Sequence, residues 1–328
     1  MGDVAVQERL APVPTEPRDV RPGRCPGDRV FWGIATGAAV SVLVLLGLVL
    51  FFLCIEAWPA LRVSGWQFLT TFEWATDSTP AHFGVGALVF GTMVIALIAL
   101  AIALPVAIGS ALFVNEYAPR RLGRPLTMLI DLLAAIPSVI YGIWGLYWLQ
   151  PHLLGTTRWL TDHLGFIPVF HTDRRVFGNS MFVAGLVVAL MILPIIASVT
   201  REVLSQVPRQ RCEAALALGG TRSGMIRAVV LPFGRSGIVG AAMLGLGRAM
   251  GETIAIALIL SINYRVTSQI LAPGGGSVAG LIANNFGEAQ GTGRSALIAA
   301  GLVLFVLTLL VNLGARVIVN RARQGPAE

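Results

Sequence analysis

The chain has 328 residues, a formal net charge of +7, and a composition that is 55% hydrophobic and only 12% charged. A soluble domain carries about 25% charged residues, so this composition excludes an ordinary soluble domain and predicts a protein that lies mostly in lipid. Every basic residue is arginine. A P-loop requires a lysine on the nucleotide phosphates, so the chain cannot be an ATPase of that class.

The chain begins with a polar segment and continues with long apolar stretches. Residues 1–29 mix proline, arginine and acidic side chains, which predicts a disordered cytoplasmic tail. A spanning helix needs about 20 apolar residues. Six stretches qualify, at about residues 30–56, 85–114, 127–150, 177–200, 236–262 and 295–316. The sequence therefore predicts an all-α membrane protein with six transmembrane helices in one domain, residues 30–320, and a C-terminal tail, residues 321–328.

Arginines gather in alternate loops between these spans. The loop over residues 201–235 alone holds Arg201, Arg209, Arg211, Arg222, Arg227 and Arg235. The positive-inside rule then places both termini and this loop in the cytoplasm. The positive charge is thus explained by topology, and we expect no nucleic acid partner. The histidines lie in the opposite loops at spacings that match no closed metal site, so we expect no metal. The sequence contains no catalytic motif, which argues against an enzyme.

The loop over residues 201–235 has an ordered pattern of its own. A run of helix-forming residues that includes Glu213 ends at Gly219-Gly220, which is a helix stop. A second short helix is expected to end at Pro232. We expect Glu213 at the start of the first helix, where a carboxylate suits the free N–H groups. The pattern predicts a compact helix-turn-helix knob to which another protein binds.

This loop resembles the coupling loop of ABC importer permeases. In that loop Glu-Ala-Ala is followed after three residues by Gly, and after nine more by Ile-x-Leu-Pro. Val229 stands here where the pattern has Ile, which is a mild departure. The resemblance implies that the following residues couple the chain to an ATPase: Glu213, Ala214, Ala215, Gly219, Leu231 and Pro232.

The fifth span contains two charged residues, Arg248 and Glu252. If the helix is continuous, their spacing of four places both side chains on one face. A charge in mid-membrane costs at least ~2.5–3.5 kcal/mol on insertion scales, so such residues face a polar path or each other. An arginine fork suits a tetrahedral oxyanion, and a nearby carboxylate would balance its charge. The alternative is a self-neutralising pair that only packs two helices.

With these residues identified, the chain over most of residues 83–316 resembles the PstC-type permease of bacterial phosphate importers. The resemblance rests on the coupling loop, on Ala135-Ile136-Pro137-Ser138-Val139-Ile140-Tyr141-Gly142, and on Gly247-Arg248-Ala249-Met250-Gly251-Glu252-Thr253. It implies a type I ABC importer permease fold in the bacterial cell membrane, with Arg248, Glu252 and Thr253 on the phosphate path. A permease for sulfate or molybdate is the alternative, and a passive channel is disfavoured.

The same resemblance implies the partners. They are a PstA-type permease that forms a heterodimer with the chain, two copies of a PstB-type ATPase, and a PstS-type phosphate-binding protein. Inorganic phosphate is the expected substrate, and membrane lipid surrounds the spans. No cofactor is expected on this chain, because ATP and Mg²⁺ would bind to the partner ATPase.

Overall fold

The computed structural model describes residues 26–76, 81–172 and 178–323. The chain divides into two units, Met1–Phe51 and Phe52–Glu328. Its helices, π-helical segments (η) and strands are α1 (Pro26–Ser64), α2 (Gln67–Thr70), β1 (Trp74–Ala75), β2 (His82–Phe83), α3 (Gly86–Leu112), η1 (Phe113–Tyr117), α4 (Arg120–Ala135), α5 (Ser138–Trp144), η2 (Gly145–Leu149), α6 (Gln150–Leu164), α7 (Met181–Ser205), α8 (Arg209–Ala217), α9 (Arg222–Met225), η3 (Ile226–Val230), α10 (Leu231–Met250), α11 (Ile254–Ile259), α12 (Val278–Asn285) and α13 (Gly291–Arg323).

The first unit contributes the beginning of α1. The stretch from Gly27 to Val49 is strongly apolar, and its length suits a helix that crosses a membrane. The helix begins at Pro26, and proline suits the first helical position because its missing N–H needs no partner there. The predicted disordered tail is therefore wrong for residues 26–29, and residues 1–25 lie outside the described part of the chain.

The described residues contain five helical stretches that are long and apolar enough to cross a membrane. They are Gly27–Ser64, Gly86–Tyr117, Met181–Ser205, Arg222–Met250 and Gly291–Val317. A sixth crossing is a broken one, Arg121–Ala135 with Ser138–Leu164, which bends by 89°. The all-α fold with six crossings is confirmed when the bent pair counts as one.

Two of the predicted spans are not continuous helices. The span at 127–150 breaks at Ile136 and Pro137, which are both extended, because a proline lacks the N–H and disfavours helix at the residue before it. The span at 236–262 breaks after Met250. At its other end this span starts earlier than expected, since helical structure runs from Arg222 through η3 into α10 without a stop at Pro232.

The main core lies where α3, α7 and α10 pack together. One face of α3 presents small side chains, including Ala96, Ala99, Ala103 and Ala107, all at most 1% exposed. Glycines on α7 and α10 lie where the neighbouring helix leaves no room for a side chain. A Cβ at Gly185 would lie 2.6 Å from Ile98 of α3, and one at Gly245 would lie 2.6 Å from Ile196 of α7. Small residues let membrane helices approach closely, so packing holds this bundle together.

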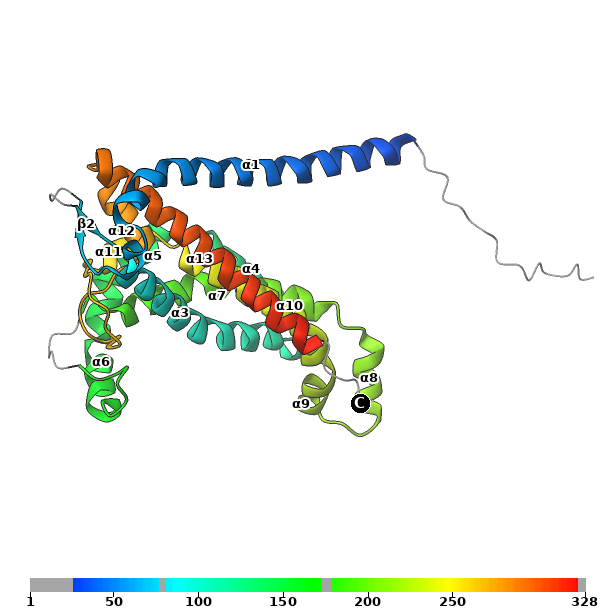
Figure 1. Cartoon of the computed structure of the whole chain (residues 1–328). Coiled ribbons are helices and arrows are strands. Elements are labelled where there is room, and N and C mark those ends of the chain that lie inside the picture. Colours follow the sequence, from blue (N-terminus) through cyan, green and yellow to red (C-terminus); the bar gives the residue numbers. More distant parts are fainter. Residues whose placement is uncertain (1–25, 77–80, 173–177, 324–328) are drawn as a thin grey trace, which may run out of the picture. The chain divides into compact units, whose positions relative to one another are not determined.

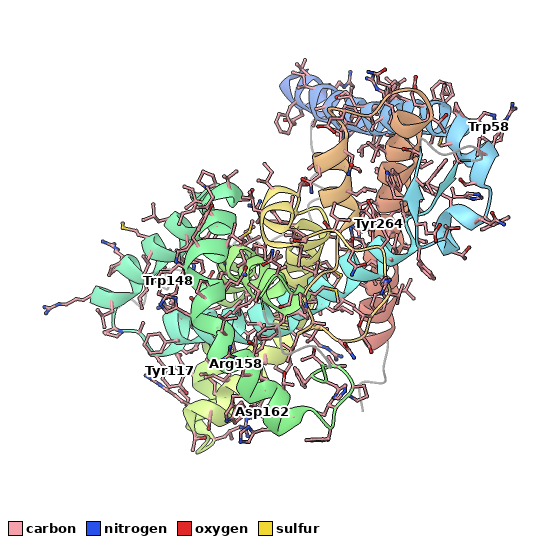
Figure 2. All side chains as sticks on the ribbon, turned by 90° about the vertical axis from the view of Figure 1, so that its left-hand side faces the viewer. Trp58, Tyr117, Trp148, Arg158, Asp162 and Tyr264 are labelled. Carbon is pink, nitrogen blue, oxygen red and sulfur yellow. The ribbon has the colours of Figure 1, made fainter. Side chains whose placement is uncertain are left out.

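The second unit has two distinct ends. Figure 1 shows α8 and α9 at one end of α7 and α10, and α11, α12 and β2 near the other. Figure 2 looks onto this second end and shows Trp58, Trp148 and Tyr264 there. Trp148 stacks on Trp144 at 5.2 Å between ring centres. Such aromatic side chains favour the membrane–water interface.

Candidate translocation site and coupling surface

The charged residues of the fifth span lie on either side of a helix break. Helix α10 ends at Met250, where the N–H of Gly251 donates to Gly247 O at 3.2 Å and that of Glu252 donates to Ala249 O at 3.3 Å. Thr253 follows, with its hydroxyl on Gly251 O at 3.0 Å. Helix α11 begins only at Ile254. The expectation that Arg248 and Glu252 share one helix face is therefore wrong.

Glu252 has a local partner that the sequence did not suggest. Its side chain is 8% exposed, and Oε1 accepts a hydrogen bond from the N–H of Ala255 at 3.2 Å. The first N–H groups of a helix have no partner within the helix, and in lipid they must find one. Glu252, one residue before the N-cap position Thr253, thus caps α11 through its side chain. A carboxylate at a helix N-terminus is also favoured by the helix dipole.

Arg248 has no such hydrogen-bond partner in the part of the chain that the structure describes. Its side chain is exposed on the last turn of α10, and within the described residues no ion pair joins it to Glu252 or to any other acid. It lies near Tyr141 of α5, close enough for its charge to act on the phenol. The hydroxyl of Tyr141 donates to Leu133 O at 3.0 Å across the break between α4 and α5. Arg248 is therefore a cation available to an anionic ligand.

The two broken spans pack against each other. Helix α5 follows the break at Pro137 and lies against α11, which follows the break at Glu252. The contact is close because Gly142 has no side chain, and a Cβ there would lie 2.9 Å from Ala255 Cα. Discontinuous helices that meet in this way are a recurring basis of substrate sites in membrane transporters.

The knob predicted between the fourth and fifth spans is present at the opposite end of α7. Its first helix is α8, and Gly219 ends it with φ +85°. The N–H of Gly219 donates to Leu216 O, and that of Gly220 to Ala215 O, so two carbonyls that the helix leaves free are satisfied. A left-handed residue is needed at this turn, which explains the glycine.

The knob is anchored by a small apolar cluster of its own. Met225, Ile226 and Val230 are buried against Ala111, Leu204 and Val207 at the ends of α3 and α7, with Ala215 and Leu231 packed alongside. A hydrogen bond also joins the ends of α3 and α7, and a cation–π contact joins the knob to the end of α3. Asn115 Nδ2 donates to Arg201 O at 2.8 Å, and the guanidinium of Arg222 lies 5.7 Å from the Tyr117 ring centre. The knob is therefore attached to both helices.

The outer surface of the knob is available for contact. Leu218 at its tip is 90% exposed and Leu216 is 41% exposed. Ala214, Pro232 and Glu213 are exposed as well. Glu213 is the fifth residue of α8, which begins at Arg209. The expectation that it lies at the helix start is thus wrong, and its carboxylate is beyond the first free N–H groups.

Cys212 lies on the inner side of the same helix. It is half-buried against the apolar cluster. Burial raises the pKa of its thiol above the usual range, and the negative charges of Glu116 and Glu213 raise it further. A raised thiol pKa means little thiolate at neutral pH, so Cys212 should react slowly. We therefore interpret it as a packing residue.

Comparison with known proteins identifies the family. The family of binding-protein-dependent transport system inner membrane components matches residues 103–324. The chain belongs to this family. The permease is 44% identical over 306 residues to a phosphate transport system permease protein PstC 2 of Mycobacterium bovis, covering 92% of this chain and 94% of the relative. It is 41% identical over 309 residues to the PstC of Xylella fastidiosa, covering 93% of each. The resemblance to PstC-type permeases is thereby confirmed.

A solved structure of another transporter has the same fold. The permease shares the fold of a chain of a bacterial alginate ABC transporter solved with its alginate-bound periplasmic protein. The TM-score is 0.59 at 16% identity, with 93% of this chain and all of that chain covered. The permease is a multi-pass protein of the bacterial inner membrane and a transport subunit, not itself an enzyme. An ATPase and a binding protein are the partners of such a subunit.

Sequence reasoning identified Arg248, Glu252 and the knob, but it missed two features of the site. One is Tyr141 of α5, which lies near Arg248 of α10 although the two residues belong to different spans. The other is a polar cavity just beyond the C-terminal end of α11, formed by residues from four separate segments. Single amides and hydroxyls between apolar residues carry no pattern that would have joined them.

Proposed function

We propose that the chain is the membrane subunit of an ATP-driven phosphate importer. The observation that carries this proposal is the identity of 44% and 41% to PstC permeases along more than nine-tenths of the chain. The exposed Arg248 at a helix break supports it, because a planar guanidinium with several N–H donors suits a tetrahedral oxyanion. A sulfate or molybdate permease has no comparable observation in its favour.

The partners follow from the same reasoning. A PstA-type permease would complete the path as a heterodimer, two PstB-type ATPases would bind the knobs from the cytoplasm, and a PstS-type protein would deliver phosphate from outside. ATP and Mg²⁺ would bind to the ATPase, since this chain has no lysine for a P-loop. Both termini of the chain would be cytoplasmic.

The continuity of the knob with α10 suggests how ATP binding reaches the path. Helical structure runs from Arg222 to Met250 without interruption, and α10 alone spans about 30 Å. Closure of the ATPase dimer would displace the knob, and α10 would carry that displacement to the break at Gly251. Arg248 lies on the last turn before the break, so its position would change between outward and inward access.

Arg248, Glu252 and Thr253 would then have separate roles. Arg248 would meet the anion directly. Glu252 would hold the start of α11 in place and keep the break open, while Thr253 closes the turn through its bond to Gly251 O. The charge of Glu252 would also limit how tightly the site holds an anion.

The test is ATP-dependent uptake of labelled phosphate by the reconstituted complex, with sulfate as competitor. We expect uptake that requires ATP and the binding protein and that excess sulfate leaves nearly unchanged. Uptake of sulfate in place of phosphate would favour the alternative oxyanion. Uptake without ATP would indicate a channel and contradict the proposal.

A further inference from the structure

A second polar site lies at the end of α7 opposite the knob. It is a cavity of about 400 Å³, lined by Gln150, Gly178, Asn179, Ser261, Ile262, Asn263, Pro273 and Gly274. The size is within the range of ligand sites in proteins. Its walls come from the start of α6, the segment before α7, and the two stretches that follow α11. None of the described residues that line it carries a charge.

The walls of this outer cavity are fastened to one another. The N–H of Gly274 donates to Asn179 O at 2.8 Å, and that of Asn263 donates to Gly275 O at 3.0 Å. Gly274 has φ +100°, and a Cβ there would lie 3.2 Å from the Asn263 side chain. The backbone thus holds these segments at a fixed separation, and a residue other than glycine would crowd Asn263.

The polar side chains have more free donors than acceptors. Gln150 Nε2 donates to Asn179 Oδ1 at 2.8 Å, Asn179 Nδ2 donates to Ser261 Oγ at 3.4 Å, and Asn263 Oδ1 accepts from the N–H of Arg265 at 3.2 Å. These bonds use two amide oxygens. Among the described residues, each of the two donating amides keeps one N–H without an acceptor, and the Asn263 amide and the Ser261 hydroxyl have no acceptor either.

One atom of the cluster is buried without a partner. Oε1 of Gln150 makes no hydrogen bond within the described part of the chain. Buried polar atoms in native structures are almost always bonded, so an unbonded one indicates that the cluster is not satisfied by the chain alone. Because this atom is an acceptor and the other free groups are donors, the guest that completes the site must both donate and accept hydrogen bonds, as the P–OH group and the oxygens of hydrogenphosphate do.

The position of the cavity relates it to the path. Ser261 and Asn263 lie just beyond the outer end of α11, and Glu252 caps the inner end of the same short helix. The cavity also adjoins the N-terminus of the 25-residue α7, where the helix dipole favours an anion although the N–H groups of Phe182 and Val183 are already bonded to Ile270 O and Ser180 Oγ. The knob is near the other end of α7, about 37 Å away. If the knob faces the cytoplasm, the cavity faces the outside.

We propose that this outer cavity binds the transported oxyanion before it reaches Arg248. Free N–H and O–H donors on a neutral wall suit an anion that accepts hydrogen bonds. The absence of charge among the described lining residues suits a site that must also release the anion. The inference rests on the proposed function, and the ligand class is a tetrahedral oxyanion such as hydrogenphosphate.

The test replaces donors by carboxylates of the same shape in the assembled complex. Asn263→Asp keeps an oxygen for the N–H of Arg265 and turns the free amide into a negative charge. Asn179→Asp does the same while keeping the acceptor for Gln150. The matched control is Asn284→Asp on α12, where the side chain is exposed and outside the cavity. Two quantities are measured with reconstituted protein: labelled phosphate uptake, and ATPase activity stimulated by the phosphate-loaded binding protein.

We expect phosphate uptake by both cavity variants to fall at least tenfold, while their stimulated ATPase activity stays within twofold of the unmodified complex. We expect Asn284→Asp to match the unmodified complex in both quantities. If a cavity variant does not assemble, Ser261→Asp, whose side chain is exposed, provides the same test. Uptake equal to the control would overturn the inference. Loss of both stimulated ATPase activity and uptake would also overturn the inference, because the cavity would then be a contact for the binding protein. Failure of all three variants to assemble would overturn it as well. No phosphate uptake by the unmodified complex would instead refute the proposed function, and this inference with it.

Discussion

Replacing Glu252 tests whether this carboxylate caps a helix or pairs with Arg248. In the structure Oε1 of Glu252 accepts from the N–H of Ala255, a residue that is 0% exposed. Glu252→Ala leaves that N–H without a partner, which costs about 1–3 kcal/mol. Glu252→Gln keeps a neutral oxygen in place, and neutral hydrogen bonds are roughly half as strong as charge-assisted ones. We therefore expect a loss of about 1 kcal/mol for Gln and two to three times as much for Ala.

The assay is the thermal denaturation midpoint of the purified complex in detergent. At about 2–4 °C per kcal/mol, the midpoint of the alanine variant should fall by several degrees and that of the glutamine variant by about a third to a half as much. Arg248→Gln should leave the midpoint nearly unchanged, since Arg248 is exposed and has no ion pair in the described residues, yet it should reduce phosphate uptake at least tenfold.

The double variant Arg248→Gln/Glu252→Gln decides between the two interpretations. Residues without shared partners give additive effects within about 0.5 kcal/mol. We expect the double variant to be as unstable as Glu252→Gln and to remain inactive in transport. If removal of both charges restores stability that each single change had lost, the two residues are paired and the capping argument is refuted.

Three further predictions concern the knob and the topology. Gly219→Leu should abolish uptake while the protein still inserts. A Cβ at this position has open space around it, but a φ of +85° costs an L-residue about 1–2 kcal/mol. Gly219→Asn should keep more activity, and equal uptake by the two variants would contradict the argument. A cysteine at Ser223 should be labelled only from the cytoplasm and one at Asp162 only from outside, and the reverse result would overturn the topology. Cys212 should react more slowly at pH 7.5 than a cysteine at Ser223, and the difference in rate should narrow as the pH rises, because burial, then Glu116 and Glu213, raise the pKa of its thiol. The measurement is the alkylation rate in inside-out vesicles, with a protein in which Cys25 and Cys54 have been replaced. Equal rates at pH 7.5 would contradict the prediction.

The residue pattern by itself determined the class of the protein and the position of the knob between the fourth and fifth spans. Apolar stretches of sufficient length can only be helices in lipid, because every backbone group must be bonded there. The knob could also be predicted from the sequence, because Gly219-Gly220 after helix-forming residues marks a helix end through local geometry alone. Both signals are local, and for that reason they can be read from the order of residues.

The breaks were decided by tertiary structure. The sequence placed Pro137 within one span, but in the structure the chain bends by 89° there and α5 packs on α11 through Gly142. The spacing of Arg248 and Glu252 predicted a shared helix face, and that prediction was wrong because Gly251 ends α10 and the carboxylate caps α11 instead. Whether an apolar helix continues or breaks depends on which neighbours satisfy the freed backbone groups. The outer cavity is decided in the same way, because Gln150, Asn179 and Asn263 are far apart in the chain and meet only when three segments are packed together.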